Sequence, residues 1–254
     1  MLYRRALPRL SARLACVAKY VIRGRAMADV GTDHAQLPVA LVLGDLVPFA
    51  IASDRAAAPL LAAAETVRRA GVGGRVRLRQ GDGLEVFAPG EVQTVVMAGM
   101  GGRTMVRILE RGFLGGVTRL VLQPQGGLVG LRRWCSQQGW WFVDEELVGE
   151  GGRHYVVEVV ERPGAAGTVA GRLLPCVDAL DRLVGPRLRE KRGRRYAEYL
   201  AQERQRVVHA LAAARSGGAA SQRVTQLLAL DGQWRAAQRE IDRRRDARSV
   251  TRGR

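Results

Sequence analysis

The residues best suited to chemistry lie in one short stretch, Asp29-Val30-Gly31-Thr32-Asp33-His34-Ala35. It follows the apolar run Ala26–Ala28 and precedes the apolar segment Leu37–Leu43. A strand that ends in an acid, turns on a glycine and starts a helix is typical of nucleotide-binding sites. Glycine lets the backbone approach a ligand closely, and the helix N-terminus offers unpaired N–H groups. We therefore expect a nucleotide-like ligand at this turn.

The turn lacks the Gly-x-Gly-x-x-Gly pattern that binds a pyrophosphate. Asp33 and His34 stand where a pyrophosphate would lie, and a carboxylate there would repel it. The carboxylates of Asp29 and Asp33 suit instead a ligand without phosphate that carries a positive sulfonium, which is S-adenosylmethionine. The residues thus favour a Rossmann-like methyltransferase, with an NAD-dependent enzyme as the alternative.

Three further loops follow expected strands and should meet this turn at the carboxyl edge of a parallel sheet. Asp54 lies 54 − 29 = 25 residues beyond Asp29, close to the interval at which an acid binds a ribose diol, so we predict that role for it. The other two loops are Gly81-Asp82-Gly83 and Ala98-Gly99-Met100-Gly101-Gly102. Their simpler alternative is structural, with the acid shaping a turn and the glycines allowing close packing.

The loop after the fourth expected strand indicates the acceptor. Enzymes that methylate exocyclic amines of nucleobases usually place Asn/Asp-Pro-Pro-aromatic there, whereas Ala98–Gly102 has no side-chain acceptor. A ring nitrogen with a free lone pair needs no prior deprotonation, so catalysis can rest on positioning. We predict that Asp33 holds the target base, accepts from its neighbouring amine and stabilises the developing charge. The simpler alternative for Asp33 is a helix N-cap.

Alternating apolar runs and helical periodicities predict the elements that position these loops. Strands are expected at 26–30, 49–53, 75–79, 92–98 and 119–123, with helices ending at 43 and spanning 56–70, 104–111 and 128–138. An amphipathic helix around Leu10–Val21 precedes the first strand. The segments 140–148 and 154–160 are expected to form an antiparallel hairpin at one edge. This order predicts an α/β fold with a mostly parallel sheet and helices on both faces.

The residues after 162 predict a second, all-α domain. Arg162–Gly167 has the composition of a linker. Apolar residues then recur at near-heptad spacing on two stretches separated by Ser216-Gly217-Gly218, which predicts two antiparallel helices packed as a coiled coil. We place the catalytic domain at 1–162, the coiled-coil domain at 173–247 and a disordered tail at 248–254.

Positive charge is the most pronounced global property of the chain. The net charge is +17, and 41 residues are Lys or Arg. Residues 1–160 hold 20 basic and 14 acidic residues, a net of +6, whereas 161–254 hold 21 and 10, a net of +11. A concentrated positive field favours nucleic acid as a partner, with a solvated charged surface as the alternative.

Composition also excludes several classes of protein. A hydrophobic content of 47% predicts a globular chain, and no apolar run approaches the roughly 20 residues of a membrane helix. Arg9 and Arg13 stand where the core of a signal peptide would be, so we expect a cytoplasmic protein without a membrane partner. We expect neither a disulfide framework nor a metal site, because the relevant residues lie far apart in sequence: Cys16, Cys135, Cys176, His34, His154 and His209.

The motifs together resemble the bacterial tRNA (adenine(22)-N1)-methyltransferases, the TrmK family. The resemblance runs from about residue 10 to 160 and rests on these segments: Leu10-Ser11-Ala12-Arg13-Leu14, Ala28–Ala35, Gly81-Asp82-Gly83-Leu84, Ala98–Gly102, Leu122-Gln123-Pro124 and Leu131-Arg132. Gly185-Pro186 and the helical stretch after it resemble the C-terminal coiled coil of that family. The resemblance implies a class I Rossmann-like fold, S-adenosylmethionine as methyl donor, and N1 of an adenine in tRNA as acceptor.

The resemblance also implies roles for individual residues. Arg13 resembles the arginine of the first helix near the cofactor, Asp33 the proposed catalytic acid, and Asp82-Gly83 the pair at the cofactor adenine. Gln36 stands where the family usually has Tyr, and Gln125 stands where Gln-Pro-Asn would be expected, which leaves base recognition open.

The cofactor site predicted from the residues and the resemblance comprises Arg13, Asp29, Gly31, Thr32, His34, Asp54, Asp82, Gly83, Ala98, Gly99, Met100 and Gly101, with Asp33 catalytic. The expected partner is tRNA, whose phosphates should bind arginines of the coiled coil. The enzyme is expected to be a monomer. The alternatives are a methyltransferase acting on another RNA or on a small molecule, and an RNA-binding protein that keeps the fold without catalysis.

Overall fold

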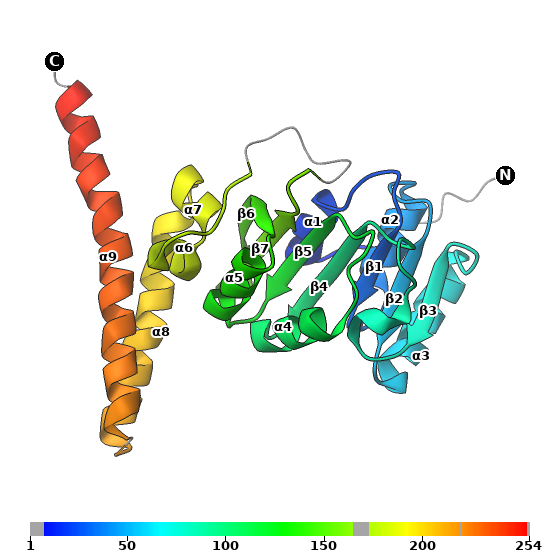
Figure 1. The fold of residues 1–254 in the computed structure, drawn as a ribbon, viewed down its shortest axis with the longest axis horizontal. Helices are drawn as coiled ribbons and strands as arrows, with labels where there is room; N and C mark the ends of the chain where they lie inside the picture. The colour runs from blue at the N-terminus through cyan, green and yellow to red at the C-terminus, as the bar shows by residue number, and fades with distance from the viewer. Residues whose placement is uncertain (1–7, 165–172, 219, 253–254) are drawn as a thin grey trace. The chain divides into compact units, whose positions relative to one another are not determined.

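The computed structural model describes residues 8–164, 173–218 and 220–252, with side chains up to Ile241 in the last segment. The chain forms two compact units, Met1–Cys176 and Val177–Arg254 (Figure 1). We call them the catalytic unit and the helical unit. Within the described residues no helix is long and apolar enough to cross a membrane.

The catalytic unit is built on a seven-stranded sheet in the order β3-β2-β1-β4-β5-β7-β6. The strands are β1 (Met27–Val30), β2 (Ala50–Asp54), β3 (Val76–Gln80), β4 (Thr94–Met100), β5 (Arg119–Pro124), β6 (Trp141–Glu150) and β7 (Arg153–Glu161). The first five strands are mutually parallel, and β7 pairs antiparallel with both β5 and β6. The expected parallel sheet with a hairpin at one edge is therefore confirmed.

Helices cover both faces of this sheet, as the alternating pattern predicts. They are α1 (Ala12–Lys19), α2 (Gln36–Leu43), α3 (Ala57–Ala70), α4 (Gly102–Arg111) and α5 (Leu128–Gln137), with a short 3-10 turn at Gly83–Val86. One apolar cluster joins alternate strand residues to α1, α2 and α3. The other joins the remaining strand residues to α4 and α5. Successive strand side chains point to opposite faces, so continuous apolar runs supply both cores.

Strand register brings the ends of the parallel strands to one edge. Val30 pairs with Ser53, and Asp54 pairs with Gln80. On the other side Met27–Asp29 pair with Thr94–Val96, so the end of β4 extends along the same edge. The loops after β1, β2, β3 and β4 therefore meet where open α/β sheets bind ligands.

The last residues of the catalytic unit contact both β6 and α5. Phe142 and Leu174 exchange backbone hydrogen bonds of 2.8 and 3.1 Å, and the Ser136 hydroxyl donates to the Cys176 carbonyl at 2.6 Å. These contacts hold residues 173–176 in the first unit, so the boundary predicted at residue 173 is a few residues too early. Residues 165–172, which hold most of the predicted linker, lie outside the described residues.

The helical unit contains α6 (Ala179–Val184), α7 (Pro186–Lys191), α8 (Tyr196–Ser216) and α9 (Ser221–Arg252). Helices α8 and α9 pack together as predicted, and Tyr199 meets Trp234 edge-on with ring centroids 6.0 Å apart. The prediction of a disordered tail from residue 248 is wrong as far as Arg252, because α9 continues through it. Arg and Ala are strong helix formers, so a helix can extend without an apolar face.

Candidate active site

The turn after β1 is fixed by backbone contacts that leave its two acids in different surroundings. The N–H groups of Gly31 and Thr32 each donate to the Ser53 carbonyl at 2.8 Å, and the Thr32 hydroxyl accepts from the N–H of Ala35 at 3.1 Å. Asp29 is 9% exposed, and burial raises its pKa to about 6, although a hydrogen bond with Thr32 acts in the opposite direction. The site thus has a carboxyl group with a perturbed pKa at its floor.

Asp33 has the opposite environment. Its side chain is 81% exposed, and its carboxylate lies 3.3 Å from Nε2 of the half-exposed His34. Helix α2 begins after Ala35, and no side chain caps it. The structure therefore does not support the simpler interpretation of Asp33 as a helix N-cap. Its carboxylate is available to a ligand.

Gly31 allows the close approach on which the sequence prediction depended. Its φ of +80° belongs to the left-handed region that favours glycine. A Cβ at this position would lie 2.5 Å from Cε of Met100, so the methionine tip packs directly over the glycine backbone. Met100, at the end of β4, thus reaches across to the turn after β1.

Two hollows lie on either side of Gly31, which lines both. The larger, of about 530 Å³, has a largely buried floor that includes Asp29 and Thr32 and an exposed rim that includes Asp33. Its other lining residues are Ser11, Arg13, Leu14, Gly31, His34, Ala35, Gln36, Leu37, Ala98, Gly99, Gln125 and Glu150. The smaller, of about 210 Å³, is lined by Val30, Gly31, Ser53, Asp54, Arg55, Gly81, Asp82, Gly83, Met100, Thr104, Arg107 and Ile108.

These hollows bring together the predicted site residues with one exception. Asp33, Arg13, Asp29, Thr32, His34, Ala98 and Gly99 line the larger hollow, Asp54, Asp82, Gly83 and Met100 line the smaller, and Gly31 lines both. Gly101, the N-cap residue of α4, lines neither. The prediction that four loops converge on one edge is thus confirmed in the geometry.

The acids of the smaller hollow are only partly engaged. One oxygen of Asp54 accepts from the N–H of Ala56 at 2.8 Å, and its backbone carbonyl accepts from the N–H of Gly81 at 3.1 Å. The N–H of Asp82 donates to Glu85 at 3.0 Å, and the Asp82 side chain is exposed. Gly83 is required for packing as well, because a Cβ there would lie 2.8 Å from Cγ2 of Ile108.

Sequence reasoning missed Ser53, which occupies the same hollow. Its side chain is 1% exposed, and its Oγ has no hydrogen-bond partner within the described part of the chain. A buried hydroxyl without a partner is unfavourable unless a ligand or water completes it. Its position at the end of an expected strand was the available signal, but the sequence does not reveal that the hydroxyl is left unpaired.

Sequence reasoning also missed the residues that hold Arg13. The fully buried Gln123 accepts through Oε1 from Nη1 of Arg13 at 2.5 Å and from the N–H of Gly99 at 3.2 Å. Glu150, from the end of β6, accepts from the N–H of Arg13 at 3.0 Å, and this bond helps hold the pKa of Glu150 below its usual value. Gln123 thereby links α1 to the loop after β4.

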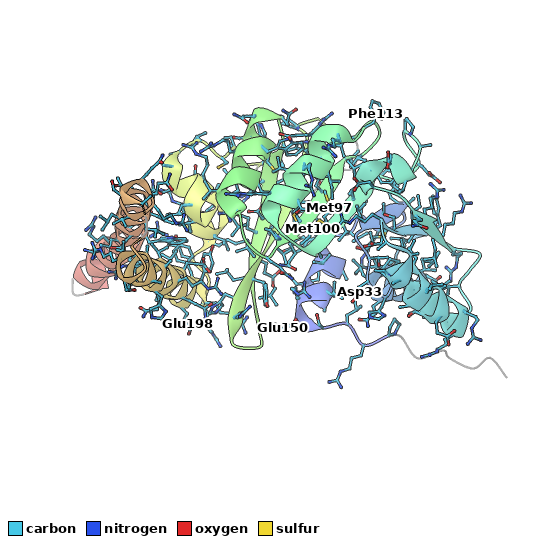
Figure 2. All side chains as sticks on the ribbon, turned by 90° about the horizontal axis from the view of Figure 1, so that it is seen from below. Asp33, Met97, Met100, Phe113, Glu150 and Glu198 are labelled. Carbon is cyan, nitrogen blue, oxygen red and sulfur yellow. The ribbon has the colours of Figure 1, made fainter. Side chains whose placement is uncertain are left out.

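The position of Glu150 follows from the hairpin rather than from a motif. In Figure 2 Asp33 and Glu150 lie towards the same side of the ribbon, and both line the larger hollow. An acid between glycines gives a weak signal for a site, because such residues are common in turns.

Among the described residues no cluster of three or more His, Cys, Asp or Glu could hold a metal ion.

Comparisons with known proteins agree with this geometry. Residues 10–157 match the family model described as a methyltransferase domain. The chain is 37% identical over 199 residues to the tRNA (adenine(22)-N(1))-methyltransferase of Bacillus subtilis, a match that covers 78% of this chain and 82% of that protein. A putative tRNA methyltransferase of Mycoplasma pneumoniae is 30% identical over 60% of this chain and 72% of its own length.

Solved structures give the same result. The crystal structure of the B. subtilis m1A22 tRNA methyltransferase TrmK is 31% identical with a TM-score of 0.77, covering 91% of this chain and 99% of that chain. A putative tRNA (m1A22) methyltransferase from Streptococcus pneumoniae, solved in complex with S-adenosyl-L-methionine, is 30% identical with a TM-score of 0.78. This match covers 91% of our chain and 100% of the S. pneumoniae chain.

Proposed function

The chain belongs to the family of tRNA (adenine(22)-N(1))-methyltransferases, and from this premise we propose that it methylates N1 of adenine 22 in tRNA. The observation that carries the proposal is the pair of acids around Gly31. Asp29 lies on the floor of the larger hollow and Asp33 on its rim. An enzyme that binds a dinucleotide would instead need hydrogen-bond donors there for the pyrophosphate. This arrangement suits a cationic donor and an acceptor that becomes cationic.

The residues fit S-adenosylmethionine, which supplies a methyl group on a positively charged sulfur to an attacking nucleophile. Asp54 and Asp82 would hold the ribose and adenine in the smaller hollow, where the unpaired Oγ of Ser53 offers one more hydrogen bond. Arg13, Asp29 and Thr32 would hold the amino-acid end in the larger hollow. Gly31 lines both hollows, and the tip of Met100, which lines the smaller one, packs against it.

The acceptor base enters from the exposed rim. Adenine N1 carries its lone pair in the ring plane, so the enzyme need not remove a proton before attack. The methylated ring gains a positive charge, which the exposed carboxylate of Asp33 stabilises while it accepts from the neighbouring amine. The rim also carries Gln36 and Gln125, whose amides have no partner among the described side chains. An amide can bind N6 and N7 of adenine together and leave N1 free.

The substrate explains the basic character of the chain. We propose that arginines of the helical unit bind tRNA phosphates, that the enzyme acts as a monomer, and that it works in the cytoplasm. Deletion of residues 177–254 should then weaken tRNA binding more than cofactor binding. Equal tRNA affinity after deletion would contradict this division of roles.

A transfer assay with full-length protein tests the function. Cofactor carrying a labelled methyl group is incubated with unmodified tRNA and with a matched tRNA in which guanine replaces adenine 22. Label should enter the first tRNA and not the second. Equal labelling of both would point to another nucleotide, and binding of tRNA without any transfer would favour the non-catalytic alternative.

A further inference from the structure

We propose that the exposed side of α4, which we call the α4 face, is an RNA-binding surface of the catalytic unit. It consists of Arg103, Arg107 and Arg111 together with Phe113 just beyond the helix. The three guanidinium groups bind phosphates of the substrate tRNA, and the phenyl ring stacks on an unpaired base. The inference rests on the proposed function, because it identifies where the catalytic unit itself holds the tRNA.

The spacing of the arginines places them on one side of the helix. They recur every four residues, and residues four apart are neighbours on a helix surface, about 6 Å apart along the axis. All three are exposed, whereas Met105 and Leu109 on the opposite side are buried in the core. The result is a straight row of positive groups that can follow a nucleic-acid backbone.

The arginines of this row are not engaged elsewhere. None of the three guanidinium groups has a hydrogen bond or ion pair within the described part of the chain. By contrast, Arg68 and Arg69 on α3 both contact Glu65, at 2.7 and 2.6 Å. A paired arginine must give up its carboxylate to bind a phosphate, whereas an unpaired one exchanges only water.

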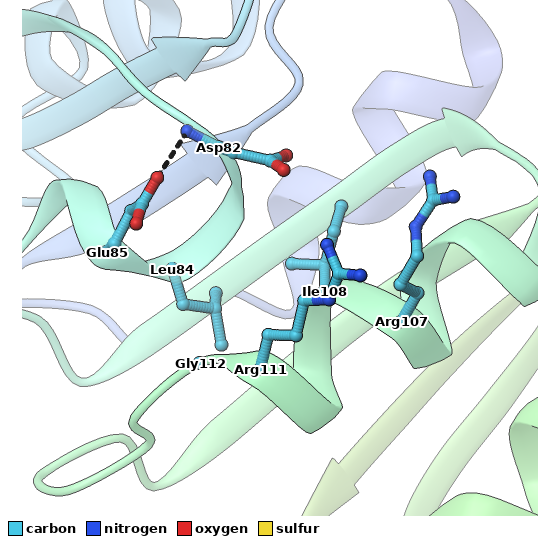
Figure 3. Close-up of a pocket in the computed structure, with 7 residues that line it drawn as sticks. All are labelled: Asp82, Leu84, Glu85, Arg107, Ile108, Arg111 and Gly112. Carbon is cyan, nitrogen blue, oxygen red and sulfur yellow. Dashed lines mark hydrogen bonds between the residues drawn. The ribbon is translucent and has the colours of Figure 1, made fainter.

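Acidic groups near the row limit where a phosphate can bind. Arg107 and Arg111 form one side of a hollow of about 140 Å³, and Asp82 and Glu85 form the other (Figure 3). Glu110 lies on the same helix and is exposed. A phosphate is therefore expected on the outer side of the arginines, away from Asp82 and Glu85.

The ring of Phe113 is exposed and is also supported by neighbouring backbone. Its side chain is 66% exposed, although phenylalanine is among the residues most often fully buried. A Cβ on Gly115 would lie 2.1 Å from Cε1 of the ring, so the phenyl group lies against backbone that only glycine leaves open. An aromatic ring held in this way provides a stacking surface for any base.

The row begins at the active site and leads away from it. Arg103 follows the N-cap of α4, and Arg107 also lines the smaller hollow. In Figure 2 Phe113 lies on the opposite side of the ribbon from Asp33. An RNA strand bound along α4 would therefore leave the active site on the side of the smaller hollow. The sequence alone predicts no RNA contact there.

The test compares two double variants of the full-length protein that lose the same charge. Arg103→Gln/Arg111→Gln removes two unpaired arginines, neither of which lines the cofactor hollows. Arg68→Gln/Arg69→Gln removes two paired arginines from α3 of the same unit. Affinity for unmodified tRNA is measured over a range of salt concentrations, with the thermal unfolding midpoint as the check on folding.

The α4 variant should bind tRNA at least about tenfold more weakly, and the slope of log K against log salt should fall by about 1.5 to 2. The α3 variant should keep the slope of the wild-type protein. Phe113→Leu should weaken tRNA binding about fivefold without changing the slope, because stacking involves no counterion.

Equal losses in the two double variants would overturn the proposal, because only the overall field would then matter. Unchanged binding in the α4 variant would overturn it as well. Methyl transfer by the wild-type protein is measured in parallel, so failure of the proposed function appears as absent transfer and not as an altered slope.

Discussion

The helical unit carries many more arginines than the α4 face, but several of them are already engaged within the fold, whereas those of the α4 face are not. Residues 177–254 hold 19 basic and 9 acidic residues, a net of +10. Arg189 contacts Asp178 at 3.0 Å and Glu240 at 3.4 Å, and Arg204 contacts Asp231 at 2.9 Å. These arginines join helices to one another. Net charge along a sequence therefore does not show which charges are available to a ligand.

The acid on the rim of the larger hollow gives the largest expected effect. Asp33→Ala should lower the rate of methyl transfer by about 100- to 1000-fold, because the developing positive charge loses its carboxylate. The free energy of unfolding should hardly change, since the side chain is 81% exposed. Single-turnover kinetics and equilibrium binding would separate the effects, and a variant with full turnover would contradict the catalytic role.

A paired arginine should affect stability where an unpaired one does not. Arg189→Gln leaves Asp178, Asp181 and Glu240 without their shared partner, and should lower the free energy of unfolding by about 2 kcal/mol. Arg103→Gln should change it by less than about 0.5 kcal/mol. Urea unfolding followed by circular dichroism measures both, and similar losses would remove the distinction between structural and available arginines.

The buried acid predicts how cofactor affinity depends on pH. Burial raises the pKa of Asp29 to about 6, so its negative charge is lost as the pH falls through that value. A cationic ligand should therefore bind about tenfold more weakly at pH 5 than at pH 7.5. Titration calorimetry at several pH values measures this dependence. Asp29→Asn should bind weakly at every pH, and a wild-type affinity independent of pH would exclude Asp29 from the site.

The unpaired hydroxyl predicts a smaller effect in the same unit. Ser53→Ala removes an Oγ that has no partner among the described residues, so the free energy of unfolding should be unchanged or slightly higher. Cofactor affinity should fall about fivefold if the hydroxyl binds the ligand. Thermal unfolding with and without cofactor measures both quantities. A loss of stability without loss of affinity would make Ser53 purely structural.

Most of the fold could be predicted because local patterns were strong. Apolar runs bounded by glycine or an acid located β1, β2 and β4 to within about two residues, and the convergence of their loops follows from parallel topology. Gln123 and Glu150 could not be assigned, since their contacts to Arg13 depend on long-range pairing across 110 and 137 residues. The short helices α6 and α7 lack enough length for a periodic pattern.

Charge availability was the other property that the sequence could not supply. Glu65 lies three and four residues before Arg68 and Arg69 and pairs with both, whereas Arg103 and Arg111 have no acid three or four residues away in the sequence. No acid engages Arg103 or Arg111 in the part of the chain that the structure describes. Arg107 is the case that needs the structure, because Glu110 lies three residues after it and yet no contact joins the two side chains among the described residues.

Mapping the product nucleotide shows whether the enzyme methylates adenine 22 and whether Asp33 is needed for the transfer. Unmodified tRNA is incubated with wild-type protein and S-adenosylmethionine, digested to nucleosides and fragments, and read by mass spectrometry. We expect 1-methyladenosine at position 22, and its loss with Asp33→Ala. A methyl group on another atom or another nucleotide, or undiminished 1-methyladenosine with that variant, would contradict the assignment of the site.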